Sequence, residues 1–345
     1  MNPSGGAVES YWNEKEMPPP FPKEEVRRAV RLEGDCRIPQ IWRPIPLLFR
    51  NEALYDFFGL WPNDVWPVKD YGLDPRRMFA LAMERRIPLH GGSTVEHFLR
   101  DVFDARERFS EFFVEPSEAW RESLASQVEA APERYHTALH IGLLFEPLYV
   151  LWGMERYLMD LIEHRRESEE LLERLLGFQI STARIYAEAG CDAILTSDDW
   201  GSQQSLLIDP ALWRSMFKPR YRRFVEAAHE LGLDVIFHSD GNLDSIFPDL
   251  VDIGFDVLNP LQPGAMDVDR WRREYRGRIG FYTGVDVQGM LPFAEPEEVS
   301  REVGKVIAQF RHESGGFLIG STNAVTAEVP FANLAALYET LMEYR

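Results

Sequence analysis

One histidine and several acidic and amide side chains follow short apolar segments in the second half of this 345-residue chain. One of these segments ends Val-Ile-Phe-His-Ser-Asp, with Asp240 as its last residue. Side chains alternate between the two faces of a strand, so His238 and Asp240 share a face. Such a pair suits half of a metal site, an acid/base pair, or a hydrogen-bonded pair without a chemical role. We predict that both residues are catalytic and that a metal ion, if one binds, is held by them.

Two adjacent carboxylates close the preceding apolar segment. Asp198 and Asp199 follow Ala-Ile-Leu-Thr-Ser and precede a tryptophan. A carboxylate at this point acts as a base or a metal ligand if it faces the site, and otherwise caps the next element. We predict that both are catalytic, whereas Glu146 either points into the site or only begins a helix. The predicted substrate-binding residues are Glu146, Trp200, Gln203, Asn259, Gln262, Tyr282, Asp286 and Asn323.

Apolar segments alternate with amphipathic helical patterns from residue 137 onward, and several of the helical patterns end in glycine. The predicted strands are 137–145, 192–198, 234–238, 255–259, 279–282 and 317–320. The predicted helices are 147–163, 168–189, 210–231, 243–252, 267–275, 295–313 and 331–344. Strands that alternate with helices predict a parallel sheet.

Two further strands, at 38–42 and 112–114, bring the number to eight. Upstream helices are predicted at 24–32, 51–58, 75–84 and 94–101. Eight strand–helix units predict an α/β fold, the (β/α)₈ TIM barrel, in which catalytic residues follow the C-terminal ends of strands. The competing open sheet is disfavoured because no Gly-rich nucleotide-binding motif follows a strand. Residues 1–23, with five of the 23 prolines, are expected to form an N-terminal arm, and residues 24–345 a single barrel domain.

Composition restricts the class of partner. The chain is 45% hydrophobic and 27% charged, as in globular proteins, and its net charge of −19 excludes nucleic acid and anionic membrane surfaces as favourable partners. The two cysteines form neither a disulfide framework nor a Cys-rich zinc module. With no segment of about 20 apolar residues and no signal-peptide pattern, a cytoplasmic location is expected. The strand ends from residue 137 on carry no Lys or Arg, which suits a metal or a neutral or cationic ligand.

These segments resemble the uroporphyrinogen decarboxylase superfamily. The resemblance is carried by Asp-Asp-Trp-Gly-Ser-Gln at 198–203, Phe-His-Ser-Asp-Gly-Asn at 237–242, Asp-Val-Leu-Asn-Pro at 256–260 and Thr-Gly-Val-Asp at 283–286. The tail at 316–334 also fits, and the opening at 29–39 is similar but looser. The resemblance implies the same TIM barrel.

The superfamily implies two activities. One branch decarboxylates uroporphyrinogen without a cofactor and opens with an R-Q-A-G-R-Y motif, whereas this chain has Trp42-Arg43-Pro44. The other branch transfers methyl groups between a corrinoid protein and a thiol or another acceptor, commonly with zinc. That branch usually carries H-x-C-G, and this chain has His-Ser-Asp-Gly at 238–241. Asn323 stands where the decarboxylases have a histidine and the methyltransferases a second cysteine, so a nitrogen- and oxygen-ligated site replaces a thiolate site.

We therefore expect a methyltransferase-like enzyme that moves a methyl group between a small methylated substrate and a corrinoid protein or another acceptor. Zinc or another divalent metal is the expected cofactor, beside the corrinoid of the partner protein. The alternative is a decarboxylase of uroporphyrinogen or another acid, which needs no cofactor. A different barrel lyase or hydrolase and a non-catalytic binding protein stay open, as does a homodimer.

Overall fold

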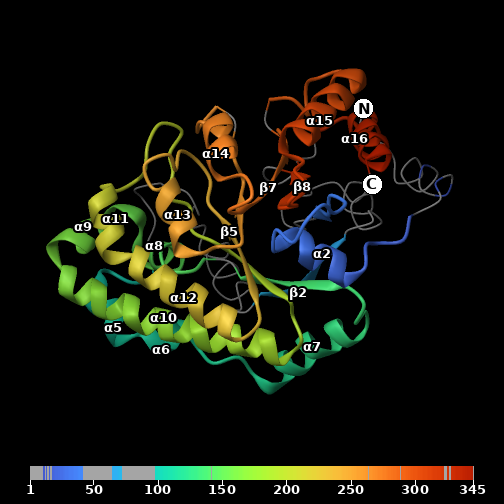
Figure 1. Cartoon of the computed structure of the whole chain (residues 1–345). Coiled ribbons are helices and arrows are strands. Elements are labelled where there is room, and N and C mark those ends of the chain that lie inside the picture. Colours follow the sequence, from blue (N-terminus) through green and yellow to red (C-terminus); the bar gives the residue numbers. More distant parts are fainter. Residues whose placement is uncertain are drawn as a thin grey trace. The chain divides into compact units, whose positions relative to one another are not determined.

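The computed structural model describes residues 11, 13, 15, 18–41, 64–71, 98–140, 142–262, 264–287, 289–321, 325 and 328–344. The chain forms two compact units (Figure 1). The first unit comprises Met1–Pro67, Glu133–Tyr135 and Asp256–Arg345, and the second comprises Val68–Pro132 and His136–Phe255.

Three parallel strands lie side by side in the second unit. They are β3 (Tyr135–His140), β4 (Ala193–Ser197) and β5 (Asp234–His238), in the order β3-β4-β5. Leu139, Ser197 and His238 are partly exposed, whereas the other residues of these strands are buried. Leu139 pairs with Leu195, and Ser197 pairs with His238, so the three partly exposed side chains share one face of the sheet.

The opposite face of these strands packs on helices. Phe237 stacks on Phe255 at 4.4 Å and contacts the ring of Tyr221 at 5.6 Å. Since Tyr221 lies on a covering helix, His238, one residue after Phe237, points away from the helix layer. The helices of this unit are α5 (Val102–Glu107), α6 (Phe109–Phe112), α7 (Glu118–Glu129), α8 (Glu146–Trp152), α9 (Met154–Glu163), α10 (Arg165–Glu188), α11 (Pro210–Met216), α12 (Lys218–Glu230) and α13 (Phe247–Ile253).

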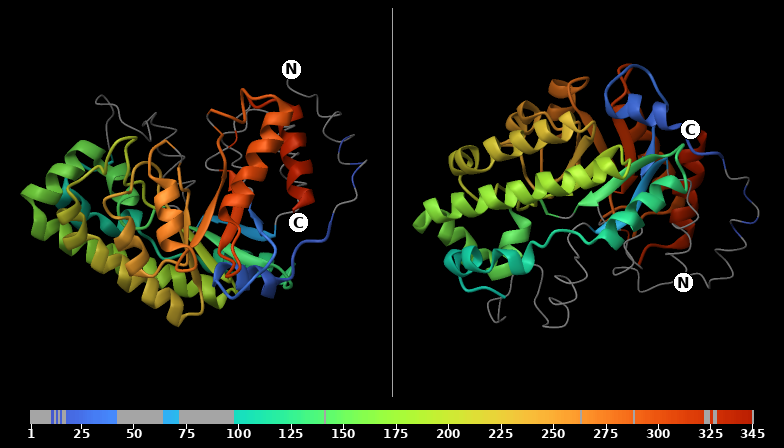
Figure 2. Two further views of the ribbon diagram at one scale, coloured as in Figure 1. Left: turned by 45° about the horizontal axis from the view of Figure 1, so that its top comes forward. Right: turned by 90° about the horizontal axis from the view of Figure 1, so that it is seen from below.

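Helix α10 carries a buried apolar stripe. Leu171, Leu172, Leu175 and Leu176 are all buried, with spacings of one, three and four residues that place them on one side of a helix. Figure 2 shows α12 beside α10, where Glu173 of α10 pairs with two arginines of α12. The two helices thus lie side by side.

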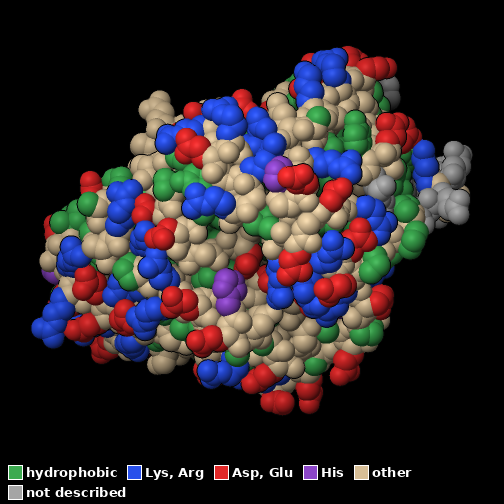
Figure 3. Space-filling model, in the orientation of Figure 1, with side chains coloured by type: hydrophobic (Ala, Val, Ile, Leu, Met, Phe, Trp, Pro, Cys, Tyr) green, Lys and Arg blue, Asp and Glu red, His purple; other side chains and the backbone are tan. Residues whose placement is uncertain are grey.

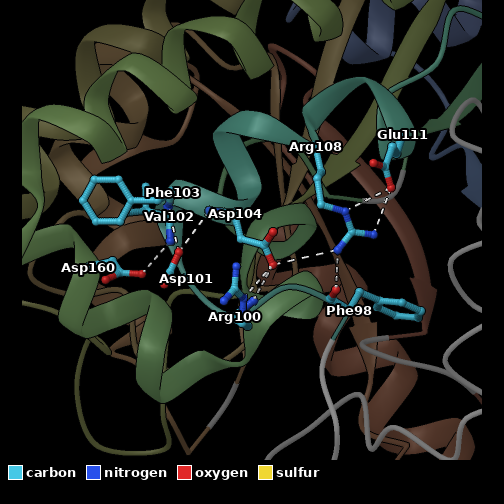
Figure 4. Close-up of polar contacts among 9 residues, drawn as sticks. All are labelled: Phe98, Arg100, Asp101, Val102, Phe103, Asp104, Arg108, Glu111 and Asp160. Carbon is cyan, nitrogen blue, oxygen red and sulfur yellow. Dashed lines mark hydrogen bonds and ion pairs between the residues drawn. The ribbon is translucent and has the colours of Figure 1, made fainter.

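Polar contacts fix the start of α5 (Figure 4). The Asp101 carboxylate accepts hydrogen bonds from Phe103 N and Asp104 N, which caps the helix. Asp160 of α9 is fully buried and accepts a hydrogen bond from Val102 N at 3.0 Å. Each bond satisfies a backbone N–H that a helix N-terminus otherwise leaves without a partner. These contacts join α5 to α9.

The first unit holds four parallel strands in the order β1-β8-β7-β6. They are β1 (Gln40–Ile41), β6 (Val257–Asn259), β7 (Gly280–Val285) and β8 (Phe317–Ser321). Its helices are α2 (Lys23–Val30), α14 (Val268–Tyr275), α15 (Pro296–Phe310) and α16 (Phe331–Glu343). One further strand, β2 (Val65–Tyr71), lies where the two units meet in sequence.

A glycine allows close packing where β1, β7 and β8 meet. A Cβ atom on Gly320 would lie 2.2 Å from the carbonyl oxygen of Ile41 and 2.6 Å from the Tyr282 ring. The Tyr282 hydroxyl donates to the same carbonyl oxygen at 3.1 Å. Tyr282 therefore links β7 to β1 across β8, and only glycine leaves room for it.

The six strands predicted from residue 137 onward are confirmed, and β3 with β4, β4 with β5, β6 with β7, and β7 with β8 pair in parallel. The fold class is α/β, the TIM barrel. The division into an arm at 1–23 and one barrel domain at 24–345 stays a prediction. Within the described part of the arm, Tyr11 contacts Phe331 and Tyr338 of α16, and Lys15 pairs with Glu339 at 2.7 Å.

Several predicted boundaries were wrong. Residues 112–114 form no strand, because Phe109 and Phe113, four residues apart, stack at 4.5 Å across one turn of α6 and its end. The predicted helix 147–163 is two helices, separated at Gly153 with φ 86°. The predicted helix 210–231 is divided at Phe217. Helices predicted at 51–58 and 75–84 lie outside the described residues, and 98–101 precede the helix α5 rather than belong to one.

The visible surface mixes charges of both signs (Figure 3). Many are helix pairs three or four residues apart, such as Arg165 with Glu169 and Arg270 with Glu274. Among the described residues, no helix combines the length and apolar character that a membrane crossing requires.

Candidate active site

The segments that follow β4 and β5 cross in direct backbone contact. A Cβ atom on Gly201 would lie 2.4 Å from Asn242 N, and one on Gly241 would lie 2.3 Å from the carbonyl carbon of Gly201. Gly241 also has φ +84°, which favours glycine. Gly201 N donates to the Asp240 carbonyl oxygen at 3.1 Å, and Asn242 N donates to that of Ser202 at 2.7 Å. The two glycines thus lock these segments together.

This crossing brings Asp199 to Asp240. Asp240 N donates to Asp199 Oδ1 at 2.9 Å, and Asp198 N donates to the His238 carbonyl oxygen at 3.0 Å. The backbone N–H of Asp240 therefore orients the carboxylate of Asp199. Asp240 is also the residue whose side chain we predicted to act together with His238. Sequence alternation alone did not give this contact.

Asp199, His238 and Asp240 form a cluster that we call the triad. His238 Nε2 lies 3.8 Å from Asp199 Oδ1 and 3.7 Å from Asp240 Oδ1. One ligand atom from each residue lies within 4.8 Å of the others. The side chains are 18%, 28% and 30% exposed for His238, Asp199 and Asp240, so solvent or a ligand can reach them.

The triad geometry fits a small divalent cation. Ligand atoms about 2.0–2.2 Å from a tetrahedral zinc ion lie about 3.4 Å from one another. The separations of 3.7 and 3.8 Å from His238 to the two carboxylates need only a small contraction. One imidazole and two carboxylates also form a donor set that zinc and harder divalent metals accept. The structure thus brings together the predicted ligands His238 and Asp240 and adds Asp199.

Glu146 lies beside the triad, at the first residue of α8. Ser197 Oγ donates to Glu146 Oε2 at 2.6 Å, and Ser197 is level with His238 in the sheet. Burial raises the pKa of Glu146 to about 8, and the negative charges of Asp199 and Asp198 add to the rise. At neutral pH this side chain therefore keeps its proton, and it can donate one.

Asp198 is turned away from that accessible face. Its side chain is fully buried and accepts five hydrogen bonds. The donors are the backbone N–H groups of Leu143 (3.2 Å), Leu144 (2.7 Å), Phe145 (2.9 Å) and Glu146 (2.8 Å) and the hydroxyl of Tyr221 (2.6 Å). Burial raises the pKa of Asp198 to about 6, while these hydrogen bonds oppose the rise. Asp198 is thus largely ionised at neutral pH and has no oxygen left for a substrate.

Trp200 and Gln203, two predicted substrate-binding residues of this unit, differ in burial. Trp200 is fully buried, stacks on Phe145 at 4.0 Å and donates its indole N–H to the Tyr221 hydroxyl at 2.8 Å. Its packing is explained by the core, so direct contact of Trp200 with a substrate is not supported. Gln203 is exposed, in the turn that follows the crossing.

The remaining predicted residues belong to the first unit. Asn259 donates to the Tyr282 carbonyl oxygen at 2.8 Å, and Tyr282 uses its hydroxyl on Ile41. Asp286 is exposed and accepts a hydrogen bond from Gly289 N at 3.1 Å. Gln262 is partly exposed. Asn323 lies outside the described residues. That these five residues bind the substrate stays a prediction.

The comparisons with known proteins agree with the fold. A sequence profile described as Uroporphyrinogen decarboxylase (URO-D) matches residues 147–344, more than half of the chain. The chain belongs to the URO-D family. The matched region of this URO-D family protein contains the triad and Asp198, and it begins one residue after Glu146.

One curated relative and one solved structure illustrate the range of the similarity. A protein of Chloroherpeton thalassium named uroporphyrinogen decarboxylase is 26% identical over 194 residues, which are 54% of this chain and 52% of that protein. The alignment thus spans about half the length of the curated relative. A solved structure, a methyltransferase from Methanosarcina mazei, is 17% identical with a TM-score of 0.66, and the match covers 94% of this chain and 99% of that one. At this identity the second similarity shows the fold alone.

Sequence reasoning missed a buried polar network behind the site. His140 Nε2 lies 2.6 Å from Gln179 Oε1, and its Nδ1 lies 3.2 Å from the Tyr186 hydroxyl. Gln179 Nε2 donates to the carbonyl oxygens of Gly142 and Leu143, so its Oε1 must accept from His140. Burial lowers the pKa of His140 to about 4. The signal was available: Gln179 and Tyr186 interrupt the apolar stripe of α10 at helical spacing.

Proposed function

We propose that this URO-D family protein is an enzyme that moves a methyl group from a small methylated substrate to a corrinoid protein or another acceptor. The observation that carries the proposal is the triad, in which Asp199, His238 and Asp240 bring their nitrogen and oxygen atoms within 4.8 Å of one another. A decarboxylase that works without a cofactor has no need for such a cluster. The structural similarity to a methyltransferase is compatible with the proposal through the shared fold.

In this proposal the triad holds zinc or another divalent metal. The metal would supply a Lewis acid that polarises the substrate atom carrying the methyl group. Sulfur ligands are not expected, because Cys191 precedes β4 and lies at the opposite end of that strand from Asp199. In the first unit, Cys36 Sγ instead donates to the Gly34 carbonyl oxygen. A set of one nitrogen and two oxygen ligands favours an oxygen- or nitrogen-bound methyl group over thiol activation.

The proton required by the reaction comes from this chain. When the bond between the methyl carbon and a substrate oxygen breaks, its electron pair stays on the oxygen. The acceptor supplies the pair for the new bond to carbon, and a proton must reach the oxygen to give the free alcohol. Glu146 keeps its proton at neutral pH and lies beside the triad, so we assign it this role. His238, between two carboxylates, serves as metal ligand and orients the substrate.

Decarboxylation is the second candidate, supported by the family and by the name of the Chloroherpeton thalassium relative. Uroporphyrinogen carries eight carboxylates, and each one buried without a partner costs several kcal/mol or takes up a proton. Among the described residues of the second unit, the accessible strand ends offer carboxylates and an imidazole but no Lys or Arg. In the first unit, Arg37 is engaged with Glu25. These charges favour a neutral or cationic substrate.

Two parallel assays test the ranking. The protein is incubated with uroporphyrinogen, and separately with methoxylated aromatic compounds and a reduced corrinoid protein. We expect methylation of the corrinoid and demethylation of the aromatic compound, and no carbon dioxide from uroporphyrinogen. Carbon dioxide from the first assay with no methyl transfer in the second would establish the decarboxylase instead.

A further inference from the structure

Asp198 accepts five hydrogen bonds beside the site, although it is not one of the reactive groups. Asp198 Oδ1 accepts from Leu143, Phe145 and Glu146, and its Oδ2 accepts from Leu144 and Tyr221. A carboxylate offers about four lone-pair positions, so five donors saturate it. Because it is also fully buried, Asp198 can neither bind a substrate nor exchange a proton without breaking these bonds.

The groups that Asp198 holds are those that face the site. It binds the backbone N–H of Glu146 at 2.8 Å, and this fixes the start of α8. In sequence it lies between Ser197, which donates to the Glu146 carboxyl group, and Asp199, which belongs to the triad. Its own backbone N–H donates to the carbonyl oxygen of His238. Asp198 is therefore connected to Glu146 through its carboxylate, and to Asp199 and His238 through its backbone.

Tyr221 of α12 completes the arrangement from the helix layer. Its hydroxyl donates to Asp198 at 2.6 Å and accepts from the Trp200 indole N–H at 2.8 Å. Burial and the charge of Asp198 both raise the pKa of Tyr221, so the hydroxyl keeps the proton that it donates. Tyr221 thus orients the carboxylate without contact with the accessible face.

We propose that Asp198, oriented by Tyr221, is the positioning residue that fixes Glu146 relative to the triad. This inference rests on the proposed function, because Asp198 sets the distance between Glu146, the proposed proton donor, and the triad, the proposed metal ligands. It assigns to Asp198 an indirect role in place of the catalytic one that the sequence suggested. Bonds to a charged acceptor are among the strongest hydrogen bonds in proteins, which makes this carboxylate an effective anchor.

The test uses a matched pair of tyrosine substitutions in the full-length protein. Tyr221→Phe removes the hydrogen bond to Asp198 and the one that the hydroxyl accepts from the Trp200 indole N–H, and it leaves the accessible face unchanged. Tyr157→Phe is the control: Tyr157 is equally buried, in the same unit, and its hydroxyl has no hydrogen-bond partner in the described structure. Two readouts are taken for each variant: amide hydrogen exchange at residues 143–146, and zinc affinity by titration calorimetry.

We expect Tyr221→Phe to speed exchange at residues 143–146 by about tenfold or more, because a hydrogen bond to a charged group is lost. Zinc binding should weaken by about ten- to a hundredfold, as for other residues that orient metal ligands. Tyr157→Phe should change neither. Equal exchange in both variants, or acceleration spread evenly over β3, β4 and β5, would overturn the inference, since the second result indicates only a loss of global stability.

The two readouts separate this inference from the proposed function. If the unsubstituted protein binds no divalent metal, the metal proposal fails, and the exchange at residues 143–146 alone decides whether Asp198 is an anchor. If zinc binds and Tyr221→Phe changes neither zinc affinity nor local exchange, the metal proposal stands and the positioning role is wrong.

Discussion

Replacing Glu146 by glutamine should change how stability depends on pH. The pKa of Glu146 is raised from 4.5 to about 8 in the folded protein, chiefly by burial. A carboxyl group with a raised folded-state pKa binds its proton more tightly when folded. Its contribution is therefore fully present below pH 4.5 and is lost as pH rises through about 8. The shift corresponds to a loss of at most roughly 5 kcal/mol across this window, since one pKa unit is about 1.4 kcal/mol.

Glutamine has a similar shape, does not titrate, and can still accept the hydrogen bond from Ser197. Relative to the unsubstituted protein, Glu146→Gln should therefore gain stability from pH 5 to about pH 8 and then level off. The assay is urea unfolding at pH 5, 6, 7, 8 and 9, with Glu163→Gln as control, because Glu163 is 50% exposed on the neighbouring helix α9. A difference between Glu146→Gln and the unsubstituted protein that is constant over this range would refute the raised pKa and with it the role as proton donor.

Three other outcomes are expected. Gly241→Ala should destabilise the protein by several kcal/mol and abolish metal binding, because its Cβ would lie 2.3 Å from Gly201. Gly177→Ala on α10 is the control and should be neutral or stabilising, because a Cβ there has nothing within 4 Å. Urea unfolding measures the stability of both variants. Burial holds the pKa of His140 near 4, so the unsubstituted protein loses stability as pH falls from about 6.5 to 4. His140→Gln should lose less stability over this range, which acid unfolding detects. Parallel stability curves for the variant and the unsubstituted protein would contradict this expectation. His238→Ala and Asp240→Ala should each abolish methyl transfer and change the free energy of unfolding by less than about 1 kcal/mol, and full activity in both would place the chemistry elsewhere.

The sequence predicted the strands that carry the site and the shared face of His238 and Asp240, because alternation along a strand depends only on local geometry. It did not predict that Asp199 joins them, because that contact comes from the backbone crossing at Gly201 and Gly241, which lies beyond the strands. It also gave Asp198 and Asp199 the same role. The structure separates them: Asp198 is fully buried and accepts five hydrogen bonds, whereas Asp199 lies on the accessible face.

The aromatic segment near residue 113 shows a different limit. Phe112-Phe113-Val114 has the composition of a strand, yet Phe113 stacks on Phe109 and contacts Phe178 of α10, so helical neighbours bury it. The strand β2 contains a proline, Pro67, which lowers the strand propensity of its segment. At Phe113 the packing of helices decided the local structure, and the composition of the segment alone does not reveal that packing.

Metal analysis of protein purified without chelators, combined with X-ray absorption spectroscopy at the bound metal, tests the central claim most directly. The account predicts about one divalent ion per chain with only nitrogen and oxygen ligands, at about 2.0–2.1 Å for nitrogen if the ion is zinc, and its loss in Asp199→Ala, His238→Ala and Asp240→Ala. Sulfur in the coordination sphere, or no stoichiometric metal even after incubation with zinc, would contradict it.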